Sequence, residues 1–137
     1  MSAASGVGAP APSSLLLDTH TFLWWAEGAN ERVTPAARSA ILAAPVVYVS
    51  IATAWEIAIK SALGKLRLGV TFAHALAINN FVQLPIALDV VERVAGMPPH
   101  HRDPFDRMLA AQALHEGLTL VTHDRAFTPY TLPVLWT

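Results

Sequence analysis

Acidic residues in this chain stand at positions from which their side chains can meet. Asp18 follows a run of three leucines, and Asp124 follows the apolar segment 118–122 with one residue between. Both segments are predicted to be buried strands. Parallel strands end at the same edge of a sheet, and ligands bind outside that edge in open α/β folds. The sequence therefore places these two carboxylates at one edge of a predicted sheet.

Helices are predicted to bring two further acids to this edge. Glu56 lies about six residues beyond Ser50, which can cap a helix, and Asp106 lies three residues beyond Asp103. Two ionised carboxylates about 5 Å apart repel by about 3 kcal/mol at an effective dielectric of 20, so protons or cations must relieve the repulsion. Oxygen ligands without cysteine favour Mg²⁺ or Mn²⁺. Such an ion activates water and stabilises charge on a phosphate, so the four acids predict phosphodiester cleavage.

The elements that must position these acids alternate between short apolar runs and helical patterns. Strands alternating with helices predict an α/β fold in which a parallel sheet has helices on both faces. The predicted strands span residues 14–17, 46–49, 82–86, 118–122 and about 134–135. The predicted helices span residues 21–27, 35–43, 51–63, 72–81, 90–95 and 104–116.

Composition limits the classes of protein that the chain can be. It has 137 residues, of which 53% are hydrophobic and 14% charged, which fits one compact domain. After Met1, residues 2–13 are only alanine, serine, glycine, proline and valine, so we expect residues 1–13 to be a flexible tail before a domain at 14–137. The chain has no cysteine, so it has no disulfide framework and no thiol chemistry. It has no basic N-terminal signal and no apolar run long enough to span a membrane, which fits a cytoplasmic protein.

Net charge does not favour bulk attraction to nucleic acid. At a net charge of −1, any contact with a polyanion depends on local basic residues. Lys60, Lys65 and Arg67 form one such group, and Arg107 and Arg125 lie near the acids in the sequence. All of them also fit an ordinary charged surface.

Several candidate residues also have a purely structural interpretation. Asp103 precedes Pro104 and fits a helix N-cap, and Asp106 in the first turn complements the helix dipole. Asp124 fits a turn. A bare carboxylate at position 18, directly after a buried leucine run, is costly unless it is paired.

The helix that carries Glu56 is predicted to bury an apolar stripe and to leave the glutamate off it. That predicted stripe consists of Ile51, Ala54, Trp55, Ala58 and Ala62. Trp24, Trp25 and Trp55, with the helix at 72–81, are expected to line an exposed apolar groove for partner proteins.

The histidines are weaker signals than the acids. His20 and His123 each neighbour a candidate aspartate and could assist proton transfer. His100 and His101 follow a proline pair, which is typical of a loop, and adjacent residues rarely ligate one metal ion together.

Taken together, these segments resemble the PIN-domain family, and most of all its VapC-type toxins of bacterial toxin–antitoxin pairs. The resemblance rests on four segments in the family's order and spacing, and it covers nearly the whole chain after the tail. The segments are LLLDTHTFLWW at 15–25, VSIATAWEI at 49–57, DPFDRMLAAQA at 103–113 and LVTHD at 120–124.

The resemblance implies an α/β/α sandwich with a central parallel sheet and an endoribonuclease that depends on Mg²⁺ or Mn²⁺. By motif position it implies catalytic roles for Asp18, Glu56, Asp106 and Asp124, the three aspartates being the metal ligands. Thr122 matches the hydroxyl residue that often precedes the last acid, and Asp103 is a supporting acid of the DPFD segment. The family also implies an RNA substrate, a homodimer and a cognate antitoxin.

Other functions remain open at this point. A receiver-type phosphoacceptor domain also gathers acids around Mg²⁺, but it needs a lysine after its last strand, and the only lysines are Lys60 and Lys65. A haloacid-dehalogenase-type phosphatase needs Asp-x-Asp, whereas this chain has Asp18-Thr19-His20. A non-catalytic PIN-like binding module would keep the fold without the chemistry.

Overall fold

The sheet and helices are seen in a computed structural model that describes residues 13–99 and 102–137. The tail expected at 1–13 falls outside this part of the chain except for Ser13, and so does the His100–His101 pair. The described residues form a five-stranded sheet with the order β4-β3-β2-β5-β6, in which every neighbouring pair is parallel. The strands are β2 Leu15–Leu17, β3 Val47–Ser50, β4 Val82–Leu84, β5 Thr119–Thr122 and β6 Val134–Trp136.

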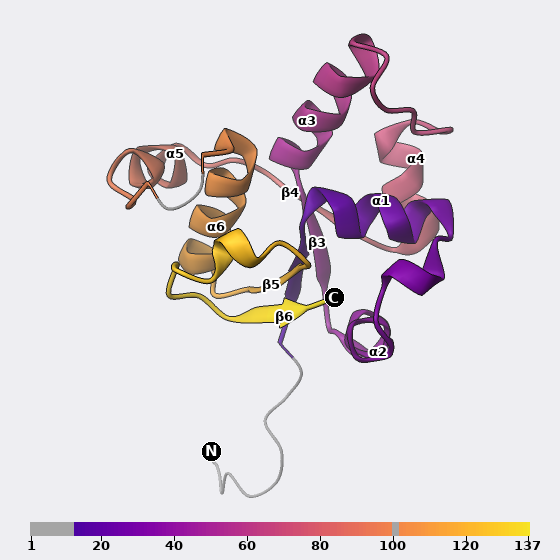
Figure 1. Ribbon diagram of the computed structural model, residues 1–137, viewed down its shortest axis with the longest axis horizontal. Helices are drawn as coiled ribbons and strands as arrows, with labels where there is room; N and C mark the ends of the chain where they lie inside the picture. Colours follow the sequence, from indigo (N-terminus) through magenta and orange to yellow (C-terminus); the bar gives the residue numbers. More distant parts are fainter. Residues whose placement is uncertain (1–12, 100–101) are drawn as a thin grey trace, which may run out of the picture.

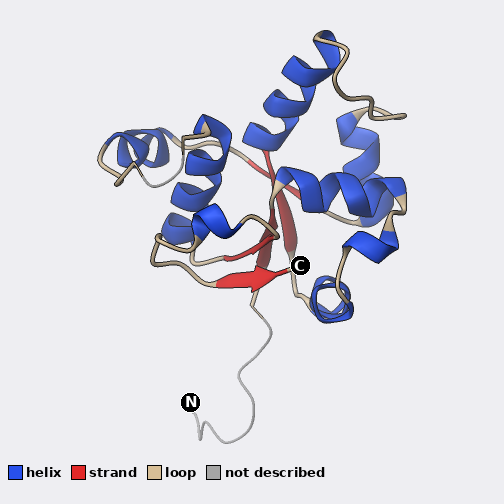
Figure 2. Ribbon diagram, viewed as in Figure 1, coloured by secondary structure: helices blue, strands red, loops and turns tan. Residues whose placement is uncertain are grey.

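Helices cover both faces of the sheet, so the α/β/α sandwich predicted from the sequence is confirmed (Figure 2). In Figure 1, α1, α2 and α4 lie on one side of the strands and α5 and α6 on the other. In the described residues the helices are α1 Thr19–Glu27, α2 Pro35–Ala43, α3 Ile51–Ala62, α4 Phe72–Asn79, α5 Leu88–Ala95 and α6 Pro104–Glu116. Two short 3-10 turns complete the elements, η1 Asn30–Arg32 and η2 Arg125–Phe127.

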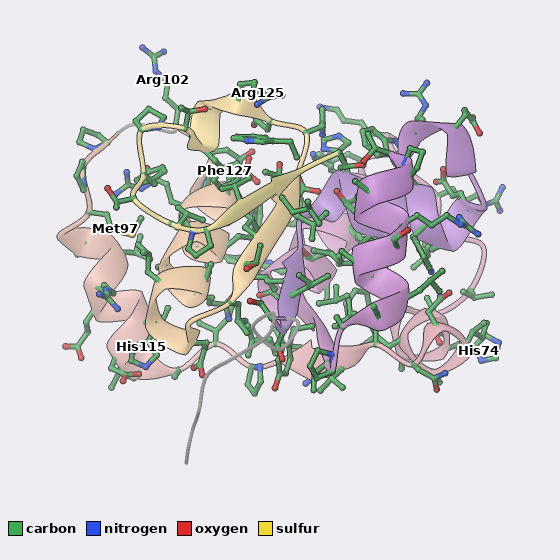
Figure 3. The ribbon with its side chains drawn as sticks, turned by 90° about the horizontal axis from the view of Figure 1, so that it is seen from below. His74, Met97, Arg102, His115, Arg125 and Phe127 are labelled. Carbon is green, nitrogen blue, oxygen red and sulfur yellow. The ribbon has the colours of Figure 1, made fainter. Side chains whose placement is uncertain are left out.

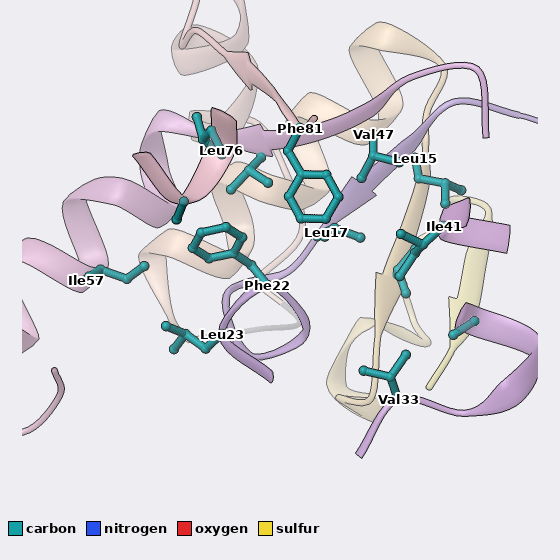
Figure 4. Packing of buried hydrophobic residues seen from close by; sticks show 14 residues of the cluster. Leu15, Leu17, Phe22, Leu23, Val33, Ile41, Val47, Ile57, Leu76 and Phe81 are labelled. Atoms are coloured by element: carbon teal, nitrogen blue, oxygen red, sulfur yellow. The ribbon is translucent and has the colours of Figure 1, made fainter. Parts of the chain in front are cut away.

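Two separate cores explain why the strands are apolar along their whole length. Successive side chains of a strand point to opposite faces, so Leu15 and Leu17 pack with α1, α2 and α4, whereas Leu16 packs with α6. Figure 4 shows the first core, in which Phe22 and Phe81 lie against the sheet. Strands buried on both faces need apolar side chains at nearly every position, which explains the continuous apolar runs in the sequence.

The chain reverses its direction across the sheet between β2 and β5. From β2 it passes to β3 and then to β4, and it returns to the other side of β2 as β5. In open parallel sheets such a reversal leaves a crevice at the carboxyl ends of the two strands. Asp18 directly follows β2 and Asp124 lies two residues beyond the end of β5, so both stand at this crevice.

The sequence-based prediction for α3 is wrong about the face that is buried. The expected apolar stripe included Trp55, but the Trp55 side chain is 61% exposed. The helix instead buries the set Ala52, Thr53, Glu56 and Ile57. Small side chains in this set let the helix approach its neighbours closely, and the polar members find partners there, so local packing overrides the apolar pattern.

Candidate active site

Asp18 is the most deeply buried aspartate of the predicted site. It is 3% exposed, and its Oδ1 accepts a hydrogen bond of 2.8 Å from the Thr21 amide, so it is the N-cap of α1. The helix therefore begins at Thr19, two residues before the position predicted from sequence. The N-terminus of a helix carries a positive partial charge that favours a carboxylate. The N-terminus of α1 thus helps to hold this carboxylate in place.

Thr122 joins the two aspartates that follow the central strands. Its hydroxyl donates a hydrogen bond of 2.5 Å to Oδ2 of Asp18 and accepts one of 3.0 Å from the Asp124 amide. The Asp124 carboxylate in turn caps η2 by accepting from the Ala126 amide at 2.9 Å. These bonds fix Asp18 and Asp124 to one fully buried side chain, as expected for two acids at one sheet edge.

Glu56 does not point outward, contrary to the sequence-based expectation. It is 4% exposed, and Oε1 accepts a hydrogen bond of 2.6 Å from the hydroxyl of Thr19. The same hydroxyl lies 3.1 Å from that of Thr53. A buried carboxylate must be hydrogen-bonded or paired. Because Thr19 directly follows Asp18, these bonds tie Glu56 to the beginning of α1, beside Asp18.

Lys60 supplies the cation that Glu56 needs. Its Nζ lies 2.7 Å from Oε2 of Glu56, one helical turn earlier on α3. The hydrogen bond to Glu56 raises the pKa of the Lys60 ammonium, and the negative charges of Glu56, Asp103 and Asp106 raise it further, while burial opposes them. The charges on α6 therefore reach Lys60, so this lysine faces acids on both α3 and α6.

Asp103 and Asp106 both stand at the beginning of α6. Asp103 is its N-cap and accepts hydrogen bonds from the amides of Phe105 at 2.8 Å and Asp106 at 3.1 Å, which confirms the capping interpretation. Asp106 lies in the first turn, and helices α3 and α6 contact each other. The contact between α3 and α6 brings the beginning of α6 to the same side of the sheet as the helix that carries Glu56.

Two contributors to the site were not predicted from sequence. Thr19 positions Glu56, and Lys60 neutralises it, whereas sequence reasoning treated Lys60 as part of a surface basic group. The spacing of four residues between Glu56 and Lys60 was the available signal, since such pairs face each other on a helix. Arg107 is structural: its guanidinium donates to backbone carbonyls at the end of α5.

The expected single groove lined by three tryptophans is not what the structure contains. Trp25 borders a hollow beside α2 and β4, whereas Trp55 borders an apolar hollow of about 280 Å³ beside α5 and α6. Trp24 instead packs against the imidazole of His123, with ring centroids 4.8 Å apart. The aromatic side chains are thus divided among three surfaces.

The donor set fits Mg²⁺ or Mn²⁺ in its chemistry, because it consists of carboxylate oxygens. Within residues 13–99 and 102–137, however, no group of three or more acidic or histidine side chains is close enough to enclose an ion. Two of the acids, Asp18 and Asp124, are linked through Thr122, and Glu56 is paired with the ammonium of Lys60.

Comparison with known families identifies this arrangement. The PIN domain family matches residues 15–130, which is most of the chain and includes all four predicted acids. The chain belongs to the PIN-domain family. The receiver-type and phosphatase alternatives are thereby replaced.

Solved structures with the same fold include VapBC and FitAB assemblies and a toxin–antitoxin complex. VapBC2 from Rickettsia felis, bound to a promoter DNA fragment, matches with a TM-score of 0.64 at 13% identity, over 89% of this chain and 97% of that one. A toxin–antitoxin complex from Klebsiella pneumoniae matches with a TM-score of 0.62 at 21% identity, over 88% of this chain and 95% of that one. FitAcB from Neisseria gonorrhoeae matches with a TM-score of 0.57 at 25% identity, over 88% of this chain and 96% of that one.

Two further comparisons complete the description. A search of the curated proteins finds no match. In the part of the chain that the structure describes, no helix is both long enough and apolar enough to span a membrane.

Proposed function

We propose that this protein is a metal-dependent endoribonuclease and the toxin of a toxin–antitoxin pair. One observation carries the proposal: the buried carboxylate of Asp18 is tied through Thr122 to Asp124, at the carboxyl ends of two adjacent central strands. Burial of a carboxylate costs desolvation energy that its hydrogen bonds must offset, and its position beside a second acid at a ligand-binding edge supports a chemical use.

The aspartates have the role of holding the ion. Asp18, Asp106 and Asp124 are the residues that would hold Mg²⁺ or Mn²⁺, which would supply a Lewis acid for the charge that develops on the phosphate. Thr122 orients two of these carboxylates, and the bond from Thr19 orients Glu56. We assign Glu56 the task of accepting a proton from the attacking water, with Lys60 controlling its charge. Asp103 supports the site by capping the helix that carries Asp106.

The partners in this proposal are RNA, an antitoxin and a second copy of the chain. Support for the antitoxin comes from the structural neighbours, several of which are toxin–antitoxin complexes. We place the protein in the cytoplasm, where such RNA is found, and assign the nuclease to residues 14–137. The antitoxin is expected to set a basic side chain against Asp18 and Glu56, because a cation there competes with metal.

Cleavage of single-stranded RNA by the purified protein tests the proposal. We expect products with Mg²⁺ or Mn²⁺, none with excess EDTA, and none from the Asp124→Asn variant, which keeps the capping oxygen but loses the charge. Millimolar Mg²⁺ should also raise the melting temperature of the wild type more than that of the variant, because a ligand stabilises the state that binds it. Cleavage that persists in chelator contradicts metal dependence. A folded wild type that binds RNA and metal without cleaving it indicates a non-catalytic binding module.

A further inference from the structure

An aromatic and basic cluster lies directly beside the two linked aspartates and has no part in the chemistry proposed above. We define the ring cluster as His20, Trp24 and His123, which come from α1 and from the residue after β5. The imidazoles of His20 and His123 are 5.3 Å apart in an edge-on arrangement, and the Trp24 ring lies 4.8 Å from His123 and 6.0 Å from His20. Each ring therefore contacts the other two.

The ring cluster is accessible from solvent. His20 and His123 are exposed, and Trp24 is half-buried. The rings meet at 45° to 84° rather than in parallel, so they do not fill one another's faces. Histidine and tryptophan faces of this kind stack on nucleobases, and such stacking tolerates any base because every base has a π-face.

Positive charge accompanies the rings. The Arg32 guanidinium lies 5.7 Å from the centre of the Trp24 ring, and that of Arg125 lies 4.1 Å from the centre of the Trp136 ring. Figure 3 shows Arg125 at the upper edge of the molecule in that view. In a chain with a net charge of −1, these guanidinium groups supply the local attraction for a polyanion that the whole molecule lacks.

The position of the cluster relative to the acids decides what it would bind. His123 directly precedes Asp124, and His20 follows Asp18 by two residues. Consecutive Cα atoms are about 3.8 Å apart, so the backbone that carries the His123 ring lies within a few ångströms of the backbone that carries the Asp124 carboxylate. In a nucleic acid each base is joined to its own phosphates through one sugar. A base on the rings thus brings a phosphate to the carboxylates.

We propose that the ring cluster is a stacking platform for one unpaired nucleobase of the RNA, next to the phosphate that is cleaved. This inference rests on the proposed function and goes beyond it by assigning a substrate-binding site. Stacking needs an unpaired base, which agrees with the single-stranded RNA of the proposed function. The residues act in binding and positioning, so their loss should raise KM or Kd more than it lowers kcat.

Oligonucleotides that lack a single base test the platform. The wild type would first be used to locate the cleaved bond in a single-stranded RNA. Abasic nucleotides would then replace each position near that bond. Binding would be measured by fluorescence anisotropy in the Asp106→Asn background, which prevents cleavage. We expect one position at which the abasic change weakens Kd by about 5- to 100-fold, the range found for one base stacked on an aromatic side chain.

Variants of the cluster then identify the partner of that base. In Trp24→Ala and His123→Ala, Kd for intact RNA should be raised to a similar degree, and the abasic change should have no further effect. His123→Phe should restore binding, because phenylalanine keeps a stacking face without the imidazole nitrogens. His74→Ala removes an exposed histidine on α4 that is not part of the ring cluster; it serves as the matched control and should leave Kd unchanged.

The possible failures are distinguishable. If the abasic change and the alanine substitution raise Kd independently, so that their fold-changes multiply, the platform is overturned. Cleavage by the wild type would still support the nuclease assignment. Variants that lose affinity for the antitoxin but not for RNA show that the cluster is a protein contact, which also overturns it. If the wild type neither binds nor cleaves RNA, both proposals fail.

Discussion

At the level of single residues, the site uses the same carboxylates for two purposes. Asp18, Asp103 and Asp124 each accept hydrogen bonds from backbone amides at the beginning of a helix or 3-10 turn. Capping needs only an accepting oxygen, whereas the proposed attraction of a metal ion depends on the negative charge. Asparagine caps a helix about as well as aspartate does, because its side-chain oxygen accepts the same hydrogen bond. Substitution by asparagine therefore separates the structural role of each residue from the electrostatic one.

The pair Asp103 and Asp106 provides the first use of this separation. Asp103→Asn should keep most of the nuclease activity and stay within about 0.5 kcal/mol of the wild-type stability, because the cap survives. Asp106→Asn should abolish cleavage with the fold intact, because it removes a charged ligand. Circular dichroism and single-turnover RNA cleavage would measure both. Equal loss of activity in the two variants would make Asp103 a metal ligand instead of a supporting cap.

Lys60 should oppose metal binding. Its ammonium lies among the negative charges that would attract the ion, so Lys60→Met should lower the Mg²⁺ concentration that gives half-maximal activity. Repulsion between one unit charge on Lys60 and the bound ion costs about 1 kcal/mol after screening, which corresponds to a change of roughly fivefold in that Mg²⁺ concentration. Because the pKa of Lys60 is raised, the lysine stays charged at every pH used for such assays.

A metal titration of cleavage rate would test Lys60 directly. Lys65→Met removes the same charge from the exposed segment after α3 and serves as the control. An unchanged half-maximal concentration in Lys60→Met, or an equal change in both variants, would contradict a specific role for Lys60.

At the level of secondary structure, the positions of Asp18 and Asp124 could be predicted and the burial of Glu56 could not. The two aspartates follow apolar strands, and parallel strands must end at one edge, so local sequence decides where these acids lie. The buried face of α3 depends instead on what the helix packs against. Its apolar residues surround the helix, so the pattern does not single out one face. Thr19 and Lys60 make the burial of Glu56 tolerable. The contact with Thr19 needed the three-dimensional structure, whereas the spacing of four residues already indicated the contact with Lys60.

A buried amide holds together the elements on the α6 side of the site. Gln112 on α6 accepts a hydrogen bond of 2.6 Å from the Ser50 hydroxyl at the end of β3 and donates one of 3.1 Å to the Pro85 carbonyl after β4. Gln112→Leu should lower the free energy of unfolding by about 1–3 kcal/mol, because two polar groups lose their partner. Urea denaturation would measure the loss.

The exposed Gln83 on β4 provides the control for this change. Gln83→Leu should alter stability by no more than about 0.5 kcal/mol, as surface substitutions usually do. Similar small losses in both variants would mean that water or neighbouring groups replace the bonds of Gln112.

At the level of the whole molecule, α3 extends beyond the sheet and exposes apolar side chains (Figure 1). Trp55, Ile59 and Leu63 follow one another at intervals of four residues and are 61%, 37% and 64% exposed. Apolar side chains at this spacing form a stripe on one side of a helix. The hollow beside Trp55 and Ile59 continues toward Val94 of α5, so the apolar surface extends past the helix itself.

We expect the homodimer to form at this stripe. Ile59→Lys places a charge in its middle and should shift the protein from dimer to monomer in size-exclusion chromatography with light scattering. Leu42→Lys changes an exposed leucine on α2 in the same way and should leave the mass unchanged. A wild type that is monomeric at high concentration, or a dimer that persists in Ile59→Lys, would contradict this interface.

If the carboxylates that cap these elements are catalytic, as proposed, the caps also affect how such a gene can be silenced. Codons for aspartate and asparagine differ by one base, so a single mutation at position 18 or 124 would keep the capping oxygen and remove the charge. The product would remain folded while losing its toxicity to the host. Colonies that survive unrestrained expression should therefore carry asparagine at these positions more often than glutamine at position 56, because Glu56→Gln leaves the ammonium of Lys60 without its carboxylate partner. Such survivors would also be the practical source of protein for crystallisation with RNA.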